Sequence, residues 1–301
     1  MRPLPGRRRR SLVAAIAVLT LLMVPAAPAS ADPGRPSTHG PSSALPPVNG
    51  QWDKPGPFQV ATKGEADTTL YYPRDIATSE YRHPVIIWGN GTFAFPLIYD
   101  GLLRHWASHG FVVAAANTPF SNTGLEMRAG IDLLAKANAQ SGSPFHGRID
   151  LGHIGAAGHS QGGAGAINAA MDPRVTTTVP IQPGPLALPS SVRSPALYLA
   201  GQKDMVVFPA LVQLLYDRTT QVPAVYAELA GAGHLTAIGN AGGFRGLTTA
   251  WLRFHLLGDE QARGVFFGSA CGICSGSTWP NVKRNAKALQ IPGSTSQRAT
   301  G

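Results

Sequence analysis

Charged residues are scarce in this sequence: Asp, Glu, Lys and Arg make up only 14% of its 301 residues. The formal net charge is +9, but five of the 25 basic residues stand within the first ten positions. The remaining 20 basic residues face 16 acidic ones, which leaves a net charge of only +4. No block of basic residues alternates with aromatic ones, so we expect no nucleic-acid partner.

Long hydrophobic runs are also missing, with one exception at the N-terminus. Residues 12–24 are apolar, follow a basic stretch and are short for a membrane span. Together with a small-residue cleavage site at 29–31, they predict a signal peptide over residues 1–31. The paired arginines Arg9 and Arg10 suit twin-arginine export as well as the general route, and an uncleaved anchor is the alternative. We expect a secreted, extracellular protein with no integral membrane segment after cleavage.

Cysteine is limited to two residues, Cys271 and Cys274. A structural zinc site needs about four ligands, and the sequence offers no second cysteine pair, so we expect no metal there. A thioredoxin-like redox motif would open a helix after an early strand, whereas this pair lies near the C-terminus. Because export leads to an oxidising compartment, we predict a disulfide between the two.

The chain after the signal peptide predicts one domain. Residues 32–56 are rich in Pro, Ser and Gly and predict a flexible leader. Residues 57–280 are enough for one large α/β domain, and residues 281–301 form a polar C-terminal tail. Nothing in the sequence indicates a repeat or a second domain, and we expect a monomer.

Short apolar runs alternate with helical patterns from residue 85 onward. The run 85–88 is wholly apolar, which is typical of a strand buried on both faces. This alternation predicts an α/β fold with a mostly parallel central sheet and helices on both faces. Segments 58–62 and 68–72, joined by a turn at 63–67, predict an antiparallel hairpin at the N-terminal edge. Further strands are expected at 111–115, 175–181, 196–200 and 224–229, and helices at 98–109, 125–138, 208–217, 247–257 and 259–267.

One stretch organises the rest of the chain. Ser160 has a glycine two residues away on either side, at Gly158 and Gly162, between an apolar run and a small-residue helical run. This G-x-S-x-G pattern in a strand–turn–helix context predicts a nucleophile elbow. The tight turn leaves no room for side chains at the glycines, and it lifts the serine hydroxyl to the start of a helix.

A serine nucleophile needs a base, and the base needs a carboxylate to orient it. On this architecture both follow the serine in the chain, on loops after later strands. Asp204 comes four residues after the strand ending at 200, and His234 follows the last strand in a loop of small residues. Asp172 and Asp217 are the runners-up for the carboxylate, but each stands at a helix end.

The reaction also needs hydrogen-bond donors for a developing oxyanion. The expected donors are the backbone N–H of Gln161, directly after the nucleophile, and that of Thr92. Thr92 ends the loop 89–92, whose glycines allow close approach of the backbone. A plain strand-to-helix turn is the alternative interpretation of this loop.

Four stretches of the sequence resemble the bacterial secreted cutinase and polyester hydrolase group of the α/β-hydrolases. They are 107–113, 158–163, 203–207 and 231–234, within a similarity that covers about residues 57–275. The resemblance implies an α/β-hydrolase fold, a catalytic triad of Ser160, Asp204 and His234, oxyanion donors at Thr92 and Gln161, and no cofactor.

The sequence also departs from this group. Its members carry an aromatic residue at the position of Thr92 and a tryptophan after the strand that follows the elbow helix, where this chain has none at 181–185. Phe93 and Phe95 are the candidates to replace this aromatic clamp, and His159 is expected to line the site wall. The cysteine spacing is also shorter than in that group.

We therefore expect a serine esterase that hydrolyses short-to-medium acyl esters. The segment 180–195 is too short for a lid domain, which favours an open site. The alternatives are cutin, polyester or lipid hydrolysis at the same site, acyl transfer to an alcohol, and a non-catalytic protein that binds a polymer or a cell wall.

Overall fold

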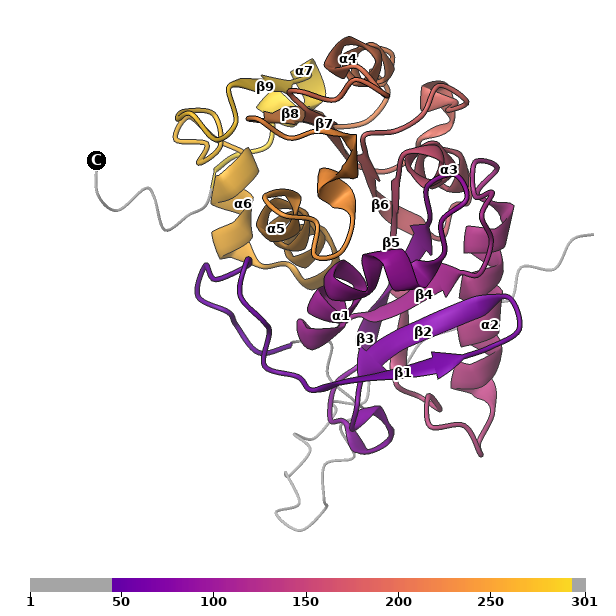
Figure 1. Ribbon diagram of the computed structural model, residues 1–301. Coiled ribbons are helices and arrows are strands. Elements are labelled where there is room, and N and C mark those ends of the chain that lie inside the picture. Colours follow the sequence, from indigo (N-terminus) through magenta and orange to yellow (C-terminus); the bar gives the residue numbers. More distant parts are fainter. Residues whose placement is uncertain (1–44, 294–301) are drawn as a thin grey trace, which may run out of the picture. The chain divides into compact units, whose positions relative to one another are not determined.

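The computed structural model describes residues 45–293, and the structural statements below concern these residues (Figure 1). The predicted signal peptide, residues 32–44 of the predicted leader and residues 294–301 of the predicted tail lie outside them. Nine strands of the described part form one sheet in the order β1-β2-β4-β3-β5-β6-β7-β8-β9. They are β1 (Val60–Gly64), β2 (Thr68–Pro73), β3 (His83–Gly89), β4 (Val112–Ala116), β5 (Ile149–His159), β6 (Val175–Ile181), β7 (Ala196–Gly201), β8 (Ala224–Leu229) and β9 (Asn281–Arg284).

The six central strands, from β4 to β8 in that order, run parallel to one another. At one edge β1 and β2 form an antiparallel hairpin, and β2 is antiparallel to β4. At the other edge β9 is antiparallel to β8. The predicted mostly parallel sheet with an antiparallel hairpin at the N-terminal edge is confirmed.

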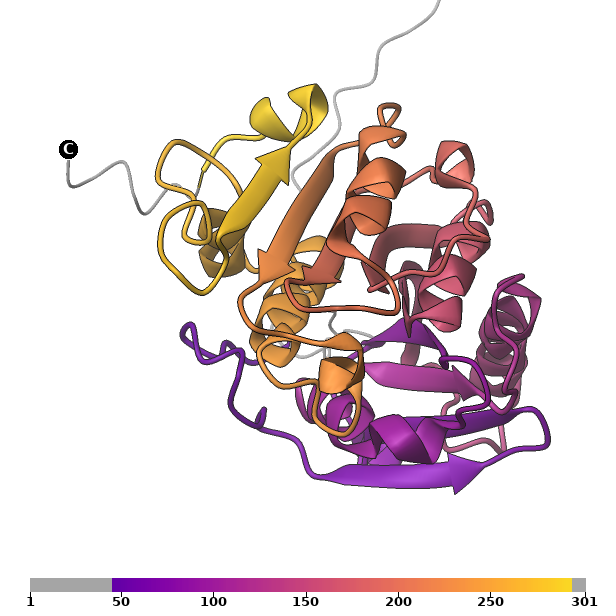
Figure 2. The same cartoon turned by 45° about the horizontal axis from the view of Figure 1, so that its top comes forward.

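Helices cover both faces of the sheet, as the two views show (Figure 1, Figure 2). On one face lie α1 (Asp100–Ser108) and α5 (Phe244–Leu257), with α6 (Glu260–Phe266) packed on α5. On the other face lie α2 (Leu125–Ala139), α3 (Gln161–Ala169) and α4 (Pro209–Asp217). The shorter elements are η1 (Ile76–Thr78), η2 (Pro96–Tyr99), η3 (Pro189–Ser191), η4 (His234–Ala237) and α7 (Ala286–Leu289).

Strand β3 shows how the sequence builds a core on each side. Ile86 and Trp88 point into the core shared with α1 and α5, while Val85 and Ile87 point into the core shared with α2 and α3. Alternate residues of a strand face opposite sides of the sheet. A strand with a core on both sides is therefore apolar at every position, which explains the unbroken run at 85–88.

The first strand of the N-terminal hairpin is shifted by two residues from the expected segment 58–62, because β1 begins at Val60 and ends at Gly64. Lys63 and Gly64, expected in the turn, belong to β1 and pair with Leu70 and Thr69. The N–H of Glu65 donates to the carbonyl of Thr68 at 2.8 Å and closes the turn there. The hydrogen-bond ladder thus shortens the turn by two residues.

The domain reaches further toward the N-terminus than the predicted boundary at residue 57. His105 Nε2 of α1 bonds to the carbonyl of Trp52, and His109 Nε2 bonds to that of Lys54, each at 2.9 Å. The N–H of Gly56 donates to Ser108 Oγ at 2.8 Å. Residues 45–56 are attached through backbone groups, which hydropathy does not reveal.

The sheet likewise continues past the predicted boundary at residue 280, because β9 pairs with β8. Asn285 holds the following turn: its side-chain nitrogen donates to the carbonyls of Thr219 and Val222 at 2.9 and 2.8 Å. The predicted disulfide between Cys271 and Cys274 is present. No helix of residues 45–293 is both long and apolar enough to cross a membrane.

Candidate active site

Ser160 stands at the sharp turn between β5 and α3, with φ 55° and ψ −119°. This left-handed region is unfavourable for a residue other than glycine, so the surrounding structure must hold the turn. A Cβ at Gly162 would overlap the carbonyl oxygen of Gly89, and one at Gly158 would overlap that of Gly162. The glycines of the motif are therefore required by close backbone contacts, as the elbow interpretation expects.

The structure brings Ser160, His234 and Asp204 together. His234 Nε2 lies 3.0 Å from Ser160 Oγ, and His234 Nδ1 lies 2.8 Å from Asp204 Oδ2. Asp204 follows β7 and His234 begins η4 after β8, so all three residues lie beyond the carboxyl ends of parallel strands. The spacing allows a proton to pass from the serine to the imidazole while the carboxylate faces the resulting positive charge.

Asp204 is almost fully buried, at 1% exposure, and its carboxylate is well supplied with donors. Its Oδ1 accepts from the N–H groups of Val206 and Val207, each at 2.9 Å. Hydrogen-bond donors of this kind offset the cost of burying a carboxylate. The runner-up Asp172 is instead paired with Arg174 at 2.7 Å, away from Ser160.

The expected oxyanion donors border the same pocket as Ser160, a hollow of about 280 Å³. Within the described part of the chain, the N–H of Thr92 has no hydrogen-bond acceptor. Gln161 is the first residue of α3, where backbone N–H groups have no acceptor within the helix. Two backbone donors are therefore available beside the serine, which is what a developing oxyanion requires. The other lining residues are Asn122, Ala164, Gly184, Pro185, Leu186, Val206 and Val207.

Gln182 also belongs to this site, although it is not among the residues predicted from the sequence. Its side chain is fully buried, and its Nε2 donates to Asp204 Oδ2 at 2.6 Å and to the carbonyl of Gly233 at 3.0 Å. Its backbone has a positive φ of 46°. Gln182 thus ties the loop of Asp204 to the loop of His234. The available signal was its position directly after β6, at the same edge of the sheet as Ser160.

His159 lies elsewhere than expected. It does not line the pocket: the side chain is 2% exposed and sits behind His234, with ring centroids 4.7 Å apart. Burial and, to a smaller extent, the neighbouring His234 together lower the pKa of His159 to about 3. The ring is therefore neutral and out of reach of a substrate in this pocket.

The two phenylalanines after Thr92 are exposed, Phe93 at 77% and Phe95 at 49%. Phe93 has a positive φ of 61° and packs edge to face on Phe120, with ring centroids 5.5 Å apart. Phe95 instead borders a neighbouring hollow with Asp100 and Arg104. Neither phenylalanine is among the residues that line the pocket, although Phe93 follows the lining residue Thr92 directly in the chain.

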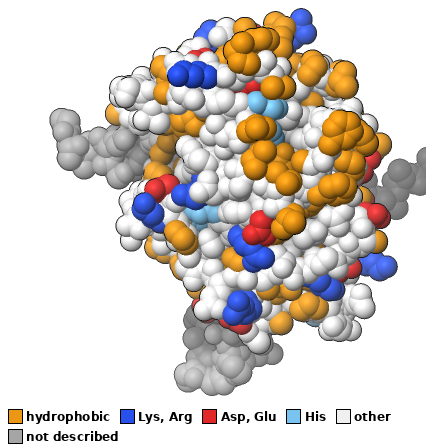
Figure 3. All heavy atoms as spheres, in the orientation of Figure 1, with side chains coloured by type: hydrophobic (Ala, Val, Ile, Leu, Met, Phe, Trp, Pro, Cys, Tyr) orange, Lys and Arg blue, Asp and Glu red, His pale blue; other side chains and the backbone are white. Residues whose placement is uncertain are grey.

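Exposed apolar side chains follow or adjoin the site residues in the chain, and we call this set the apolar rim. A contiguous patch of exposed apolar side chains on a protein surface often marks a binding site. Figure 3 shows hydrophobic side chains gathered around a histidine on the face turned to the reader. The rim consists of Phe93, Phe120, Leu186, Met205, Val206 and Leu235.

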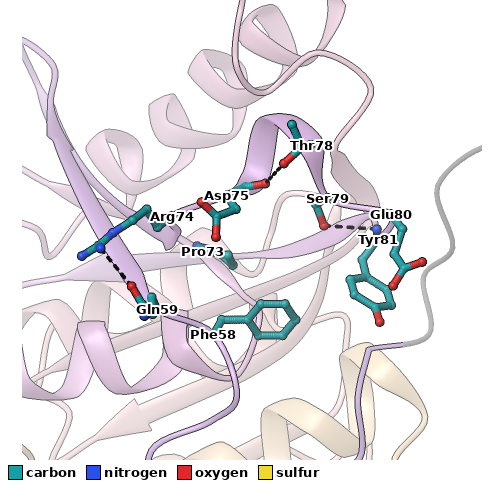
Figure 4. A pocket seen from close by; sticks show the side chains of 9 residues that line it. All are labelled: Phe58, Gln59, Pro73, Arg74, Asp75, Thr78, Ser79, Glu80 and Tyr81. Carbon is teal, nitrogen blue, oxygen red and sulfur yellow. Dashed lines mark hydrogen bonds between the residues drawn. The ribbon is translucent and has the colours of Figure 1, made fainter.

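A larger hollow, of about 400 Å³, lies at the hairpin edge of the sheet and contains Ser79 (Figure 4). Ser79 Oγ lies 2.8 Å from His83 Nε2, but His83 Nδ1 bonds to the carbonyl of Gly110 rather than to a carboxylate. The two carboxylates at this hollow, Asp75 and Glu80, make no bond to His83. No group of three or more metal-binding side chains occurs within residues 45–293. The smaller pocket beside Ser160 is therefore the better candidate for the active site.

The parallel sheet, the strained serine after β5 and the Ser–His–Asp alignment define an α/β-hydrolase. The chain belongs to the PET hydrolase-like family, whose family model matches residues 33–274. It is also similar to the bis(hydroxyethyl) terephthalate hydrolase of Streptomyces coelicolor, with 31% identity over 215 residues, 67% of this chain and 68% of the relative. The predicted fold and the predicted kinship with polyester hydrolases are confirmed, and the protein is a hydrolase of the carboxylic-ester class.

Proposed function

We propose that this protein hydrolyses carboxylic esters through Ser160, His234 and Asp204. The observation that carries the proposal is the 3.0 Å contact between Ser160 Oγ and His234 Nε2, with Asp204 on the other ring nitrogen. The Ser160 proton passes to Nε2 as Oγ attacks the ester carbonyl. Asp204 holds the His234 tautomer and stabilises the imidazolium.

The remaining steps use the same groups. The negative oxygen of the tetrahedral intermediate accepts hydrogen bonds from the N–H groups of Thr92 and Gln161. The intermediate collapses, and the alcohol leaves with the proton from Nε2. Water then gives one proton to Nε2 as its oxygen attacks the acyl-enzyme. The second tetrahedral intermediate collapses to the acid, and Nε2 returns the proton to Ser160 Oγ. This sequence needs no cofactor.

We propose short-to-medium acyl esters as the substrates. The pocket of about 280 Å³ and its apolar lining suit a compact apolar acyl group. The named substrate of the Streptomyces relative, bis(hydroxyethyl) terephthalate, is a small aromatic diester and is a suitable first probe. Polyester or cutin hydrolysis is a second candidate, because the apolar rim continues outward from the pocket and could rest on an insoluble polymer.

We also infer that the enzyme is secreted and works as a monomer. Export is supported by the basic and apolar N-terminal sequence with its small-residue cleavage site. A monomer is supported by the site itself, because the nucleophile, base, carboxylate and donors all come from one chain.

The first test is hydrolysis of p-nitrophenyl esters from acetate to palmitate, and of bis(hydroxyethyl) terephthalate. The wild type should act on the shorter esters, and Ser160→Ala should lose about 10⁶-fold in kcat. An inactive wild type, or full activity in the variant, would refute the proposal and favour a non-catalytic binding protein. Release of soluble acid from a polyester film tests the second candidate, and ester formation in mixed solvent tests acyl transfer.

A further inference from the structure

A chain of hydrogen bonds behind the pocket joins the oxyanion loop to the backbone of His234. The N–H of Gly91 lies 3.0 Å from Tyr99 Oη, and Tyr99 Oη lies 2.9 Å from His159 Nδ1. His159 Nε2 lies 3.0 Å from the carbonyl oxygen of His234. Gly91 directly precedes Thr92, so the chain connects one expected oxyanion donor with the expected base.

The chemistry of the end groups fixes the direction of every bond. The amide of Gly91 can only donate, so Tyr99 Oη accepts there and directs its own hydrogen to His159 Nδ1. The carbonyl of His234 can only accept, so His159 carries its hydrogen on Nε2. Each donor thus meets one acceptor, in a single arrangement of protons.

The chain lies in the interior, where an unpaired polar group is costly. Tyr99 is 1% exposed, and its ring packs edge to face on Trp88 with centroids 4.9 Å apart. A Cβ at Gly91 would lie 2.9 Å from Tyr99 Oη, so glycine at this position allows the hydroxyl to reach the amide. Removing one member leaves a buried donor or acceptor unsatisfied, and the loop must shift to compensate.

We propose that Tyr99 and His159 are positioning residues that hold the oxyanion loop and His234 at a fixed distance from each other. The inference rests on the proposed function. Negative charge develops beside Thr92 as positive charge develops on His234, so both groups must be placed correctly in the same transition state. Neither Tyr99 nor His159 borders the pocket, and both act through their neighbours.

The test compares Tyr99→Phe with Tyr198→Phe. Tyr198 is also fully buried and bonded through its hydroxyl, to Thr219 Oγ1 at 2.7 Å, but it lies away from the pocket. Tyr99→Phe should lower kcat for p-nitrophenyl acetate about ten- to a hundredfold with KM within twofold. Tyr198→Phe should lose a similar amount of thermal stability while keeping kcat.

A second pair of variants tests His159. Gln at this position offers one acceptor and one donor, whereas Leu offers neither, so His159→Gln should retain at least tenfold more kcat than His159→Leu. Raised KM with unchanged kcat in any of these variants would make the residue a substrate contact and overturn the proposal. Unchanged kcat and KM would overturn it as well. An inactive wild type would instead refute the proposed function.

Discussion

Two serine–histidine pairs in this molecule have nearly the same hydrogen bond but different surroundings. Ser160 Oγ lies 3.0 Å from His234 Nε2, and Ser79 Oγ lies 2.8 Å from His83 Nε2. Behind His234 stands the carboxylate of Asp204, whereas a backbone carbonyl stands behind His83. A carboxylate stabilises an imidazolium, and a neutral carbonyl does so far less.

The serines differ as well. Ser160 has a φ of 55° at the start of a helix, and Ser79 has an ordinary φ of −57° at the end of a short one. Ser79 Oγ also accepts the N–H of Tyr81 at 3.1 Å, and burial lowers the pKa of His83. The serine–histidine contact is therefore common to both pairs. The carboxylate behind His234, the positive φ of Ser160 and the free backbone donors beside it distinguish the pair that we propose as catalytic.

The largest effect is expected from Asp204→Asn, which makes the proposed catalytic pair resemble the Ser79–His83 pair by removing the carboxylate behind its histidine. The new side-chain amide would face His234 Nδ1 and move the ring proton to Nε2, where it blocks proton transfer from Ser160. We expect kcat to fall about 10⁴-fold without loss of the fold. Ester hydrolysis measures kcat, and circular dichroism measures the fold. A loss of kcat below tenfold would mean that Asp204 does not orient His234.

Gln182→Leu should lower kcat by a smaller factor than Asp204→Asn does. It removes the bonds to Asp204 and to the carbonyl of Gly233, so both loops lose their common tie. We expect kcat to fall about tenfold to a hundredfold, because small displacements of reacting groups lower the rate strongly. The control is Gln221→Leu, because Gln221 likewise makes two side-chain hydrogen bonds, to the carbonyls of Pro189 and Val192 at 2.7 and 2.9 Å, and does not line the pocket of Ser160. Equal kcat values in the two variants would show that Gln182 does not position the residues of this site.

Acid should destabilise the fold through its buried neutral histidines. Burial lowers the pKa of His105 and of His109 from 6.5 to about 4, so the unfolded chain binds protons there first. Stability is therefore full above pH 6.5 and decreases as the pH falls toward 4. Melting temperatures across this range should drop by several degrees, and His109→Gln should flatten the curve. A melting temperature independent of pH would contradict this.

The smallest effect is expected from Ser79→Ala, which tests whether the Ser79–His83 pair contributes to ester hydrolysis. Loss of the bond to His83 should reduce the free energy of unfolding by about 1 kcal/mol and leave kcat unchanged. A fluorophosphonate probe, followed by mass spectrometry, should label Ser160 once per chain. Label on Ser79, or lower kcat in its variant, would show that the second pair is reactive.

Much of this architecture was accessible from local sequence. Strands β3, β4 and β7 are buried on both faces, so their apolar runs stand out in the sequence. Gly158 is required by a contact with Gly162 within the turn, whereas Gly162 is required by the carbonyl of Gly89 at the end of β3. The positions of Asp204 and His234 followed from chain order, because parallel strands bring their carboxyl ends to one edge of the sheet.

Other features depend on partners far away in the chain. Tyr99 bonds to His159 across 60 positions, and Trp52 is held by His105 across 53. A side chain that forms a hydrogen bond with a group far away in the chain leaves no periodic or compositional signal in the sequence. For the same reason the sequence misplaced His159 in the site wall and ended the domain too early at both ends.

The sequence by itself determined the alternation of strands and helices and the turn that carries Ser160, and it indicated Asp204 and His234 as the residues that we propose to act with the serine. These inferences depend on local sterics and on chain order. Only the tertiary structure decided which serine–histidine pair has a carboxylate behind it and which buried residues hold that pair in place. Those outcomes depend on the register and packing of segments that meet only when the sheet is complete.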